Sequence, residues 1–209
     1  MSGSRGPGET ATIVLGAASV GALVAALCYY TLTLGYKSFC MLFAALLPAM
    51  VANGGALALT RLYARSIAPG SRLHPVDFGL RLGGARLLGD GKTWEGLILG
   101  TLAGLVAGLI VCWGTGWFPV YYGGVVGFSA LLGDMAGSFI KRRLGLARGQ
   151  CAPLLDQLDF YAASLAAVWL LGYAPVTLPD SATLAAVVVA LHTSTNMISW
   201  AAGLKEEWC

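Results

Sequence analysis

The chain has 209 residues, of which 57% are hydrophobic and only 11% are charged, and its formal net charge is +3. Soluble domains carry about 25% charged residues, so this composition excludes an ordinary water-soluble globular protein. The basic residues are concentrated in two patches, so the small positive charge does not indicate nucleic acid as a partner.

Apolar segments follow one another along the chain, separated by shorter polar connections. A helix needs about 20 apolar residues to span a bilayer, and most of these segments approach or exceed that length. They predict about six transmembrane helices, with five possible, near residues 11–34, 38–63, 95–113, 117–137, 156–173 and 181–203. The expected fold class is therefore an all-α, polytopic transmembrane helix bundle.

Two connections carry most of the basic residues and predict the orientation of the bundle. Six lysines and arginines border or occupy 61–92, and four more lie within 138–155, whereas the turns near 114–118 and 172–180 carry none. Cytoplasmic connections of membrane proteins are enriched in Lys and Arg, so both basic loops are predicted to be cytoplasmic. Helix parity then brings them together as the mouth of an active site.

The segment after the first basic loop carries glycines at a strict four-residue spacing, at positions 96, 100, 104 and 108. In membrane helices such a ridge of small residues lets a neighbouring helix approach closely. We interpret this ridge as packing and not as chemistry.

The first basic loop ends in Gly89-Asp-Gly-Lys-Thr-Trp-Glu-Gly96, immediately before a predicted helix. Backbone N–H groups at a helix start and a nearby lysine attract phosphate oxygens, which makes Gly91, Lys92 and Thr93 candidate phosphate ligands. The turn is not a Walker A motif, because the first glycine of that motif is absent and no strand precedes it. Ordinary helix capping would explain the same residues. Asp77, earlier in this loop, either joins a nucleotide site or sets a turn.

Three aspartates flank the second basic loop. Asp134 follows a long apolar run, where inserting a carboxylate costs about 2.5–3.5 kcal/mol, so a partner must compensate. Asp156 and Asp159 are three residues apart, which places both on one helix face. Ion pairing with Lys141 or Arg142, and helix-dipole complementation, are the structural alternatives. Three carboxylates at one basic mouth favour Mg²⁺, which binds carboxylate, water and substrate phosphate oxygens.

Taken together, these motifs resemble those of the CTP-dependent phosphatidate cytidylyltransferases. The matching stretches are Gly91-Lys-Thr-Trp-Glu-Gly96, Gly133-Asp134-x-x-x-Ser138-x-x-Lys141-Arg142 and Asp156-x-x-Asp159. The chain departs from that pattern ahead of the acidic pair, where Ala152-Pro153-Leu154-Leu155 replaces a His-Gly-Gly sequence. It departs again inside the pair, where Gln157 replaces an arginine.

The archaeal CDP-archaeol synthases resemble the chain more closely. The resemblance rests on Leu47-Pro-Ala-Met-Val-Ala-Asn53-Gly54, Pro75-Val-Asp77-Phe-Gly79, Leu88-Gly-Asp-Gly-Lys-Thr93, Leu155-Asp-Gln-Leu-Asp159 and the closing His192…Asn196…Gly203-Leu-Lys205…Trp208. It covers about residues 40–209. Residues 1–37 lie outside it and are interpreted as an N-terminal extension with an extra apolar helix, ahead of a cytidylyltransferase transmembrane domain at 38–209.

The resemblance implies transfer of CMP from CTP to 2,3-bis-(O-geranylgeranyl)-sn-glycerol 1-phosphate. The products would be CDP-archaeol and pyrophosphate, in the synthesis of archaeal membrane phospholipids, with Mg²⁺ as the cofactor. The residue chemistry agrees, because a lipid phosphate would attack the α-phosphorus in line while metal, lysine and arginine stabilise the departing charge. No side-chain nucleophile is required, since the lipid phosphate is already ionised.

The roles expected from this chemistry are as follows. Catalysis would depend on Lys92, Asp134, Lys141, Asp156 and Asp159. The three aspartates would hold Mg²⁺, while Asp77, Gly91, Lys92, Thr93, Lys141 and Arg142 would contact nucleotide or phosphate groups. Asn53 and Asn196 would contact the lipid headgroup, with the lipid chains lying between helices. An interhelical hydrogen bond is the structural alternative for Asn196 and for His192, four residues before it.

Other interpretations remain at this stage. A phosphatidate cytidylyltransferase would use the same site on diacyl lipid. A CDP-alcohol phosphotransferase would need an aspartate pattern that the chain lacks. A transporter would place its charges in broken helices at the bilayer midplane, whereas here they cluster toward one face. The expected partners are CTP, a lipid phosphate and the membrane, with a homo-oligomer possible. The expected location is the cell membrane, multi-pass, with the active site facing the cytoplasm.

Overall fold

A computed structural model describes residues 36–67, 72–147, 150, 152 and 154–201 of the chain. The predicted helix at 11–34 lies outside these residues, as does almost all of the extension at 1–37.

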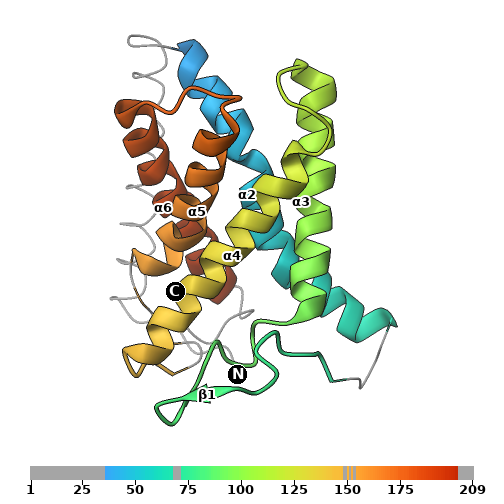
Figure 1. Ribbon diagram of the computed structural model, residues 1–209, viewed down its shortest axis with the longest axis vertical. Helices are drawn as coiled ribbons and strands as arrows, with labels where there is room; N and C mark the ends of the chain where they lie inside the picture. Colours follow the sequence, from blue (N-terminus) through green and yellow to red (C-terminus); the bar gives the residue numbers. More distant parts are fainter. Residues whose placement is uncertain (1–35, 68–71, 148–149, 151, 153, 202–209) are drawn as a thin grey trace.

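The described residues form a bundle of helices that run in alternating directions (Figure 1). The helices are α2 (Tyr36–Leu62), α3 (Trp94–Thr115), α4 (Tyr122–Arg143), α5 (Leu155–Leu171) and α6 (Leu178–Ala201). A π-helical turn, η2 (Tyr63–Ile67), follows α2, and a small hairpin of β1 (Arg81–Leu82) and β2 (Ala85–Arg86) lies before α3. The alternation brings residues 72–93 of the long connection, the end of α4 and the start of α5 to the same end of the bundle.

Three of the described helical segments are long and apolar enough to cross a membrane, by length and composition. They are Lys37–Ser66, Trp94–Thr115 and Tyr122–Arg143. Helix α5 has 17 residues, which is at the lower limit of about 17 for a spanning helix. The predicted class, an all-α transmembrane bundle, is confirmed.

One face of α3 is a contact surface for α2 and α4, as its glycine ridge predicts. Gly100, Gly104 and Gly108 are buried. A Cβ atom at Gly104 would lie 3.0 Å from the Cα of Gly127 on α4 and 3.1 Å from the Cβ of Ala52 on α2. The backbones therefore touch, and only glycine fits between them.

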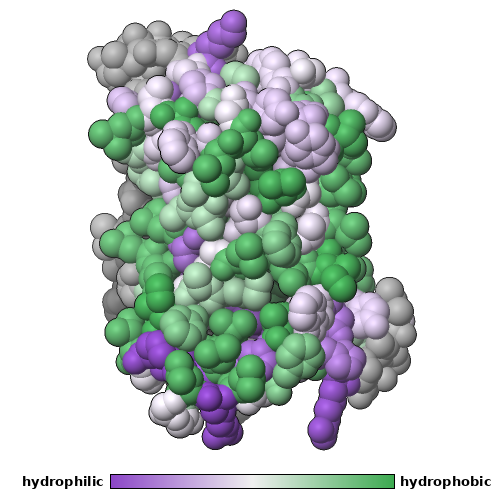
Figure 2. Space-filling view, viewed as in Figure 1, coloured by the Kyte–Doolittle hydropathy of each residue, from purple (hydrophilic) through white to green (hydrophobic). Residues whose placement is uncertain are grey.

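The other face of α3 carries exposed apolar side chains at every fourth position. Trp94, Ile98, Leu102, Val106 and Ile110 are 39%, 55%, 51%, 56% and 65% exposed. Because α3 is a membrane-spanning segment, we call this row the lipid-facing stripe. Green, hydrophobic atoms cover much of the molecular surface in Figure 2, as expected for a protein surrounded by lipid.

The structure corrects the predicted end of α4. The hydropathy pattern predicts that this segment ends at residue 137 and that the next cations lie in a loop, whereas α4 continues to Arg143. The three cations at 141–143 form its last turn, where positive charge interacts favourably with the helix dipole. Gly145, with a φ of 76°, then lets the chain turn away. Asp134 and Lys141, seven residues apart, consequently lie on one face of the same helix.

The glycine contact predicts a position-specific effect on stability. A Cβ atom at Gly108 would lie 2.7 Å from the backbone nitrogen of Gly123, which no side-chain rotation can relieve. We expect Gly108→Ala to lower the Tm in detergent, with an overpacking cost of about 1–3 kcal/mol.

Gly114→Ala, on the same helix, is the matched control. No heavy atom lies within 4 Å of a Cβ atom at Gly114, so alanine there should be neutral or stabilising by up to about 1 kcal/mol. Equal Tm values for the two variants would contradict the proposed backbone contact.

Candidate active site

A cavity of about 740 Å³ lies at the end of the bundle where the two basic connections meet. This size suits a small-molecule ligand, for which pockets of about 300–1,000 Å³ are usual. Its polar lining residues are Asn53, Thr60, Arg61, Asp90, Lys92, Thr93, Asp134, Lys141, Gln150, Asp156, His192 and Asn196. Its larger apolar lining residues are Met50, Leu57, Leu73, Leu97, Leu131, Met135, Phe160, Val188 and Leu191. The cavity thus combines a strongly charged part with an apolar wall made by the helices.

Lys92 and Asp134 form the first ion pair of this cavity. Lys92 Nζ lies 2.5 Å from Asp134 Oδ2, and the two side chains are 22% and 28% exposed. The backbone around Lys92 is fixed, because its carbonyl accepts a hydrogen bond of 2.8 Å from the N–H of Val76. This ion pair therefore joins the end of the long connection to the middle of α4.

Lys141 and Asp156 form the second ion pair. Lys141 Nζ lies 2.8 Å from Asp156 Oδ1, and the side chains are 17% and 19% exposed. Asp156 Oδ2 also accepts a hydrogen bond of 3.0 Å from the N–H of Ala152, three residues before α5 begins. The second pair links α4 to α5, so the two helix-borne aspartates of the cavity wall, Asp134 and Asp156, each face one lysine.

Asp159 lies beside this arrangement, at the contact between α4 and α5, and is not part of the cavity lining. A Cβ atom at Gly137 would lie 2.9 Å from the Cβ of Asp159, so the glycine gives Asp159 its space. Asp159 is close enough to interact with the charges of Asp134, Lys92 and Asp156. All three predicted metal ligands are thus neighbours at one end of the bundle.

These three aspartates do not form a ready-made metal cage. Among the described residues, no three His, Cys, Asp or Glu side chains are grouped closely enough to hold a metal ion. In the structure a lysine ammonium lies against Asp134 and another against Asp156. Their carboxylate oxygens are nevertheless the donor type that Mg²⁺ prefers.

Thr93 has the capping role that was considered for it, and its place in the cavity keeps a phosphate contact as a prediction. It is the N-cap of α3, and its Oγ1 accepts a hydrogen bond of 3.2 Å from the N–H of Gly96. It also lines the cavity beside Gly91 and Lys92. Glu95 secures this helix start, because its carboxylate accepts a 3.1 Å hydrogen bond from the N–H of His74. The turn that carries Lys92 is therefore held by the beginning of α3.

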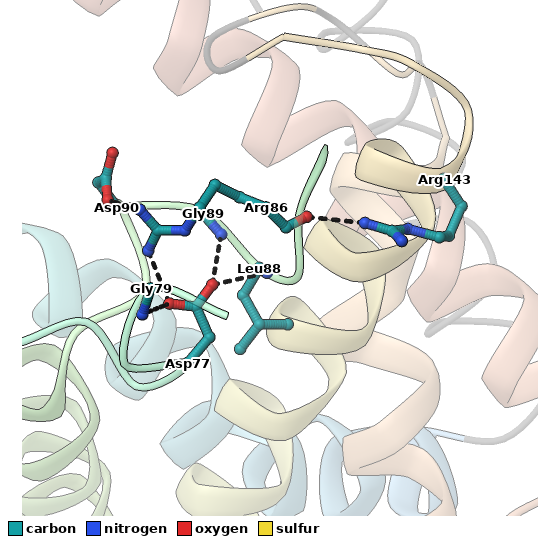
Figure 3. A network of polar contacts seen from close by, with 7 residues as sticks. All are labelled: Asp77, Gly79, Arg86, Leu88, Gly89, Asp90 and Arg143. Atoms are coloured by element: carbon teal, nitrogen blue, oxygen red, sulfur yellow. Dashed lines mark hydrogen bonds and ion pairs between the residues drawn. The ribbon is translucent and has the colours of Figure 1, made fainter. Parts of the chain in front are cut away.

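Asp77 is buried within the long connection and is not part of the cavity lining (Figure 3). Its Oδ1 accepts hydrogen bonds from Arg86 (2.7 Å) and the N–H of Gly79 (3.1 Å), and its Oδ2 accepts from the N–H groups of Leu88 (3.0 Å) and Gly89 (3.2 Å). Burial acts to raise the pKa of Asp77, but these hydrogen bonds outweigh it and hold the pKa well below its usual range. The carboxylate sets the turn that leads to Lys92, which is one of the two roles expected for it, and its contact with a nucleotide stays a prediction.

Arg142 is also outside the cavity lining, although the sequence analysis assigned it to a phosphate. Its guanidinium donates to the carbonyl of Leu146 and lies near Gly89, where a Cβ atom would be 3.5 Å from Arg142 Nε. The predicted headgroup residues Asn53 and Asn196, by contrast, line the cavity from α2 and α6.

The structure adds residues that the sequence analysis did not assign to the site. Thr60 and Arg61 line the cavity, seven and eight residues after Asn53, so helical spacing from Asn53 would have found them. Gln150 also lines it, but it lies in a connection without periodicity and gave no such signal. Arg143 supports the site from outside, since it donates to the carbonyls of Leu82 (2.6 Å) and Arg86 (2.8 Å).

Comparison with known proteins places this arrangement in a family. The family described as "CarS-like: CDP-archaeol synthase" matches residues 39–209. The chain belongs to the CDP-archaeol synthase family. The CDP-archaeol synthase of Aeropyrum pernix is 45% identical over 163 residues, covering 77% of this chain and 87% of that protein. The CDP-archaeol synthase of Hyperthermus butylicus is 46% identical over 158 residues, covering 73% and 86%.

A solved structure agrees with this membership of the CDP-archaeol synthase family. It is described as an intramembrane enzyme for archaeal membrane lipids biosynthesis, and it superposes with a TM-score of 0.63 at 44% identity. The match covers 74% of this chain and 91% of that one. The predicted resemblance is confirmed, and the chain is a membrane-embedded enzyme of the CDP-archaeol synthase family, which disfavours the transporter interpretation.

The Asp77 network predicts how the long connection responds to substitution and to acid. A depressed folded-state pKa means that Asp77 stabilises the fold fully above its ordinary pKa of about 3.9, and that this stabilisation is lost as the pH falls below that value. At neutral pH, Asp77→Asn should open the connection, because each hydrogen bond to a charged group contributes about 1.5–3 kcal/mol. Limited trypsin digestion should then cleave after Arg81 and Arg86 about tenfold faster or more.

Asp90→Asn is the matched control, since Asp90 pairs with the same Arg86 but is 63% exposed. Exposed ion pairs contribute about 0–1 kcal/mol, so this variant should be cleaved at close to the unmodified rate. Indistinguishable cleavage of the two variants would show that the Asp77 network does not hold the connection.

Proposed function

We propose that this enzyme transfers CMP from CTP to 2,3-bis-(O-geranylgeranyl)-sn-glycerol 1-phosphate, giving CDP-archaeol and pyrophosphate for archaeal membrane phospholipids. The observation that carries the proposal is one cavity with two Lys–Asp ion pairs at its charged part and an apolar wall between helices. Such a cavity suits a reaction between a polyphosphate and the phosphate of a lipid. The names of the related proteins support the same product.

In the proposed reaction, an oxygen of the lipid phosphate attacks the α-phosphorus of CTP. The new bond joins this oxygen to the α-phosphorus, and the bond from the α-phosphorus to the α–β bridging oxygen breaks, so pyrophosphate leaves. A phosphomonoester has its second pKa near 6, so the attacking group is largely ionised at neutral pH and needs no general base. Lys92 and Lys141 would stabilise the charge on the departing pyrophosphate.

Two lysines of the cavity are suited to change partners when the nucleotide binds. In the structure each neutralises one aspartate, which lowers the cost of placing a carboxylate in an apolar bundle. Phosphate oxygens would compete for both ammonium groups. The carboxylates of Asp134 and Asp156, with Asp159 beside them, would then be available for Mg²⁺, which when bound would neutralise phosphate charge.

The lipid would bind with its phosphate near the lysines and its chains along the apolar wall. Asn53 and Asn196 lie on different helices of the cavity and could bond the glycerol-phosphate headgroup. The positive-inside rule predicts that the basic connections, and therefore the cavity mouth, face the cytoplasmic side of the cell membrane, where CTP would be available.

The first functional prediction concerns substrates. Purified protein in micelles should incorporate labelled CTP into an organic-extractable product with the archaeal ether lipid phosphate, and only poorly with diacyl phosphatidate. The chemistry of the lipid chains gives little discrimination between the two lipids, because a buried methylene contributes about 0.8 kcal/mol in either one. The shape of the groove and the stereochemistry of the headgroup must therefore select the lipid.

The expected orientation is tested with sealed vesicles. Inverted vesicles should use external CTP, whereas right-side-out vesicles should not.

Equal or better turnover of the diacyl lipid would assign the protein to phosphatidate cytidylyltransferase activity, with the same catalytic residues. Failure of CTP to label either lipid would contradict the proposed reaction itself.

The second functional prediction concerns the charged residues. Asp134→Asn and Asp156→Asn should abolish turnover, and Asp159→Asn should reduce it severely, with the Tm in detergent measured in parallel to confirm folding. Lys92→Ala should lower turnover about 100-fold and raise the KM for CTP more than that for lipid. Lys37→Ala, an exposed lysine at the opposite end of α2, should leave activity unchanged. Near-native activity of all three aspartate variants at limiting Mg²⁺ would make these side chains structural.

A further inference from the structure

The hairpin ahead of α3 has one charged face and one apolar face. Its register pairs Arg81 with Arg86 and Leu82 with Ala85, across a turn in which Gly83 and Gly84 have φ values of 60° and 81°. Residues directly opposite each other share a face of a β-ladder, and successive residues alternate between faces. The two arginines therefore lie on one face, and Leu82 and Ala85 lie on the other.

The apolar face extends by one further residue pair. The N–H of Leu87 donates a 2.9 Å hydrogen bond to the carbonyl of Leu80, which continues the ladder and places both leucines on the face of Leu82. Leu80 and Leu82 are 60% and 53% exposed, and Phe78, at the start of the hairpin, is 77% exposed. We call these three residues the hairpin patch.

The hairpin is anchored to the protein through its other groups. Arg86 on the charged face pairs with buried Asp77, and Arg143 from α4 donates to the backbone carbonyl of Arg86 (Figure 3). Arg143 also donates to the carbonyl of Leu82. These contacts fix the hairpin at the end of the bundle. Since the anchors are charges and backbone groups, the leucine side chains remain on the surface.

The hairpin patch continues the lipid-facing stripe of α3. The ring centroids of Phe78 and Trp94 are 6.2 Å apart, and Trp94 is the first residue of that stripe. Trp side chains are enriched where a membrane meets water, so Trp94 marks the level of the bilayer surface. Figure 2 shows hydrophobic atoms continuing among the hydrophilic side chains at the lower end of the molecule, where the hairpin lies.

We propose that this hairpin lies in the surface layer of the bilayer, on the side of the cavity mouth. The hairpin patch would enter the boundary between headgroups and acyl or prenyl chains, as the apolar face of an interfacial element does. Exposed Arg81, on the opposite face, would remain with water and anionic headgroups. The turn that carries Lys92 follows the hairpin directly, so the membrane itself would help to hold that turn at the mouth.

A lipid surface fits this patch better than a second copy of the chain. Stable protein interfaces bury about 800 Å² on each partner, which three side chains on a two-stranded hairpin do not provide. A bilayer needs no matching shape, and it already surrounds the stripe with which the patch is continuous.

Nitroxide accessibility tests the proposal on the full chain. The five native cysteines would be replaced, and single cysteines placed at Leu80, Leu82 and Arg81 would carry a nitroxide in vesicles of phosphatidylcholine and phosphatidylglycerol. Oxygen concentrates in the bilayer, and a water-soluble nickel chelate stays outside. We expect the oxygen-to-nickel collision ratio at Leu80 and Leu82 to be severalfold above that at Arg81, their neighbour on the opposite face.

Two reference sites calibrate the measurement: Ile98 on the lipid-facing stripe and exposed Asp90. Ratios at Leu80 and Leu82 that equal the Asp90 value would overturn the proposal. Shielding from both reagents, with spin–spin broadening between labelled copies, would also overturn it and identify a second copy as the occupant. The use of two leucine positions guards against a local disturbance by either label, and an unchanged Tm confirms folding.

Discussion

The cost of placing carboxylates inside an apolar bundle is the constraint on which the site depends. Asp134 lies well within α4, and Asp156 lies in the first turn of α5, so each must be neutralised by a nearby cation. The chain meets this requirement with one lysine for each aspartate, at 2.5 and 2.8 Å. In each pair the lysine and the aspartate come from different elements. The first pair therefore joins the long connection to α4, and the second joins α4 to α5. The same two ion pairs thus neutralise the aspartates, hold the end of the bundle together and bring the charged groups of the cavity close to one another.

Close helix packing makes these contacts possible. Glycines let α3 touch α2 and α4, and Gly133 and Gly137 let α4 approach the segment of α5 that carries Asp159. A larger residue at Gly133 would collide with Ala163, whose Cβ atom would be 2.7 Å from the new Cβ. The helices therefore hold the three aspartates near one another by backbone geometry, which is more rigid than side-chain contact alone.

The connection before α3 supplies the remaining order. Asp77 gathers three backbone N–H groups and Arg86, and Arg143 fastens the hairpin to the end of α4. The turn with Lys92 is consequently held from three sides: by the Asp77 network, by the start of α3 and by its ion pair with Asp134. If a polyphosphate drew the Lys92 side chain away from Asp134, the backbone of the turn would still be held in place. Such a fixed backbone favours a reaction that depends on positioning.

The sequence by itself determined the class of the protein, because apolar segments long enough for a bilayer and clustered basic connections follow directly from residue order. It also determined the glycine ridge of α3, because helical spacing is a local property. The expectation that Lys92, Asp134, Lys141 and Asp156 lie close together followed from the topology, which brings their segments to one face of the membrane. Only the tertiary structure decided that Lys92 pairs with Asp134, 42 residues away, and that Asp77 is buried in a turn. It also decided that Arg142 lies outside the cavity wall and that α4 runs on through its cations. Such outcomes depend on which groups, far apart in the sequence, come close enough in space to compete for the same charged partner. The order of residues along the chain does not show which of them will meet.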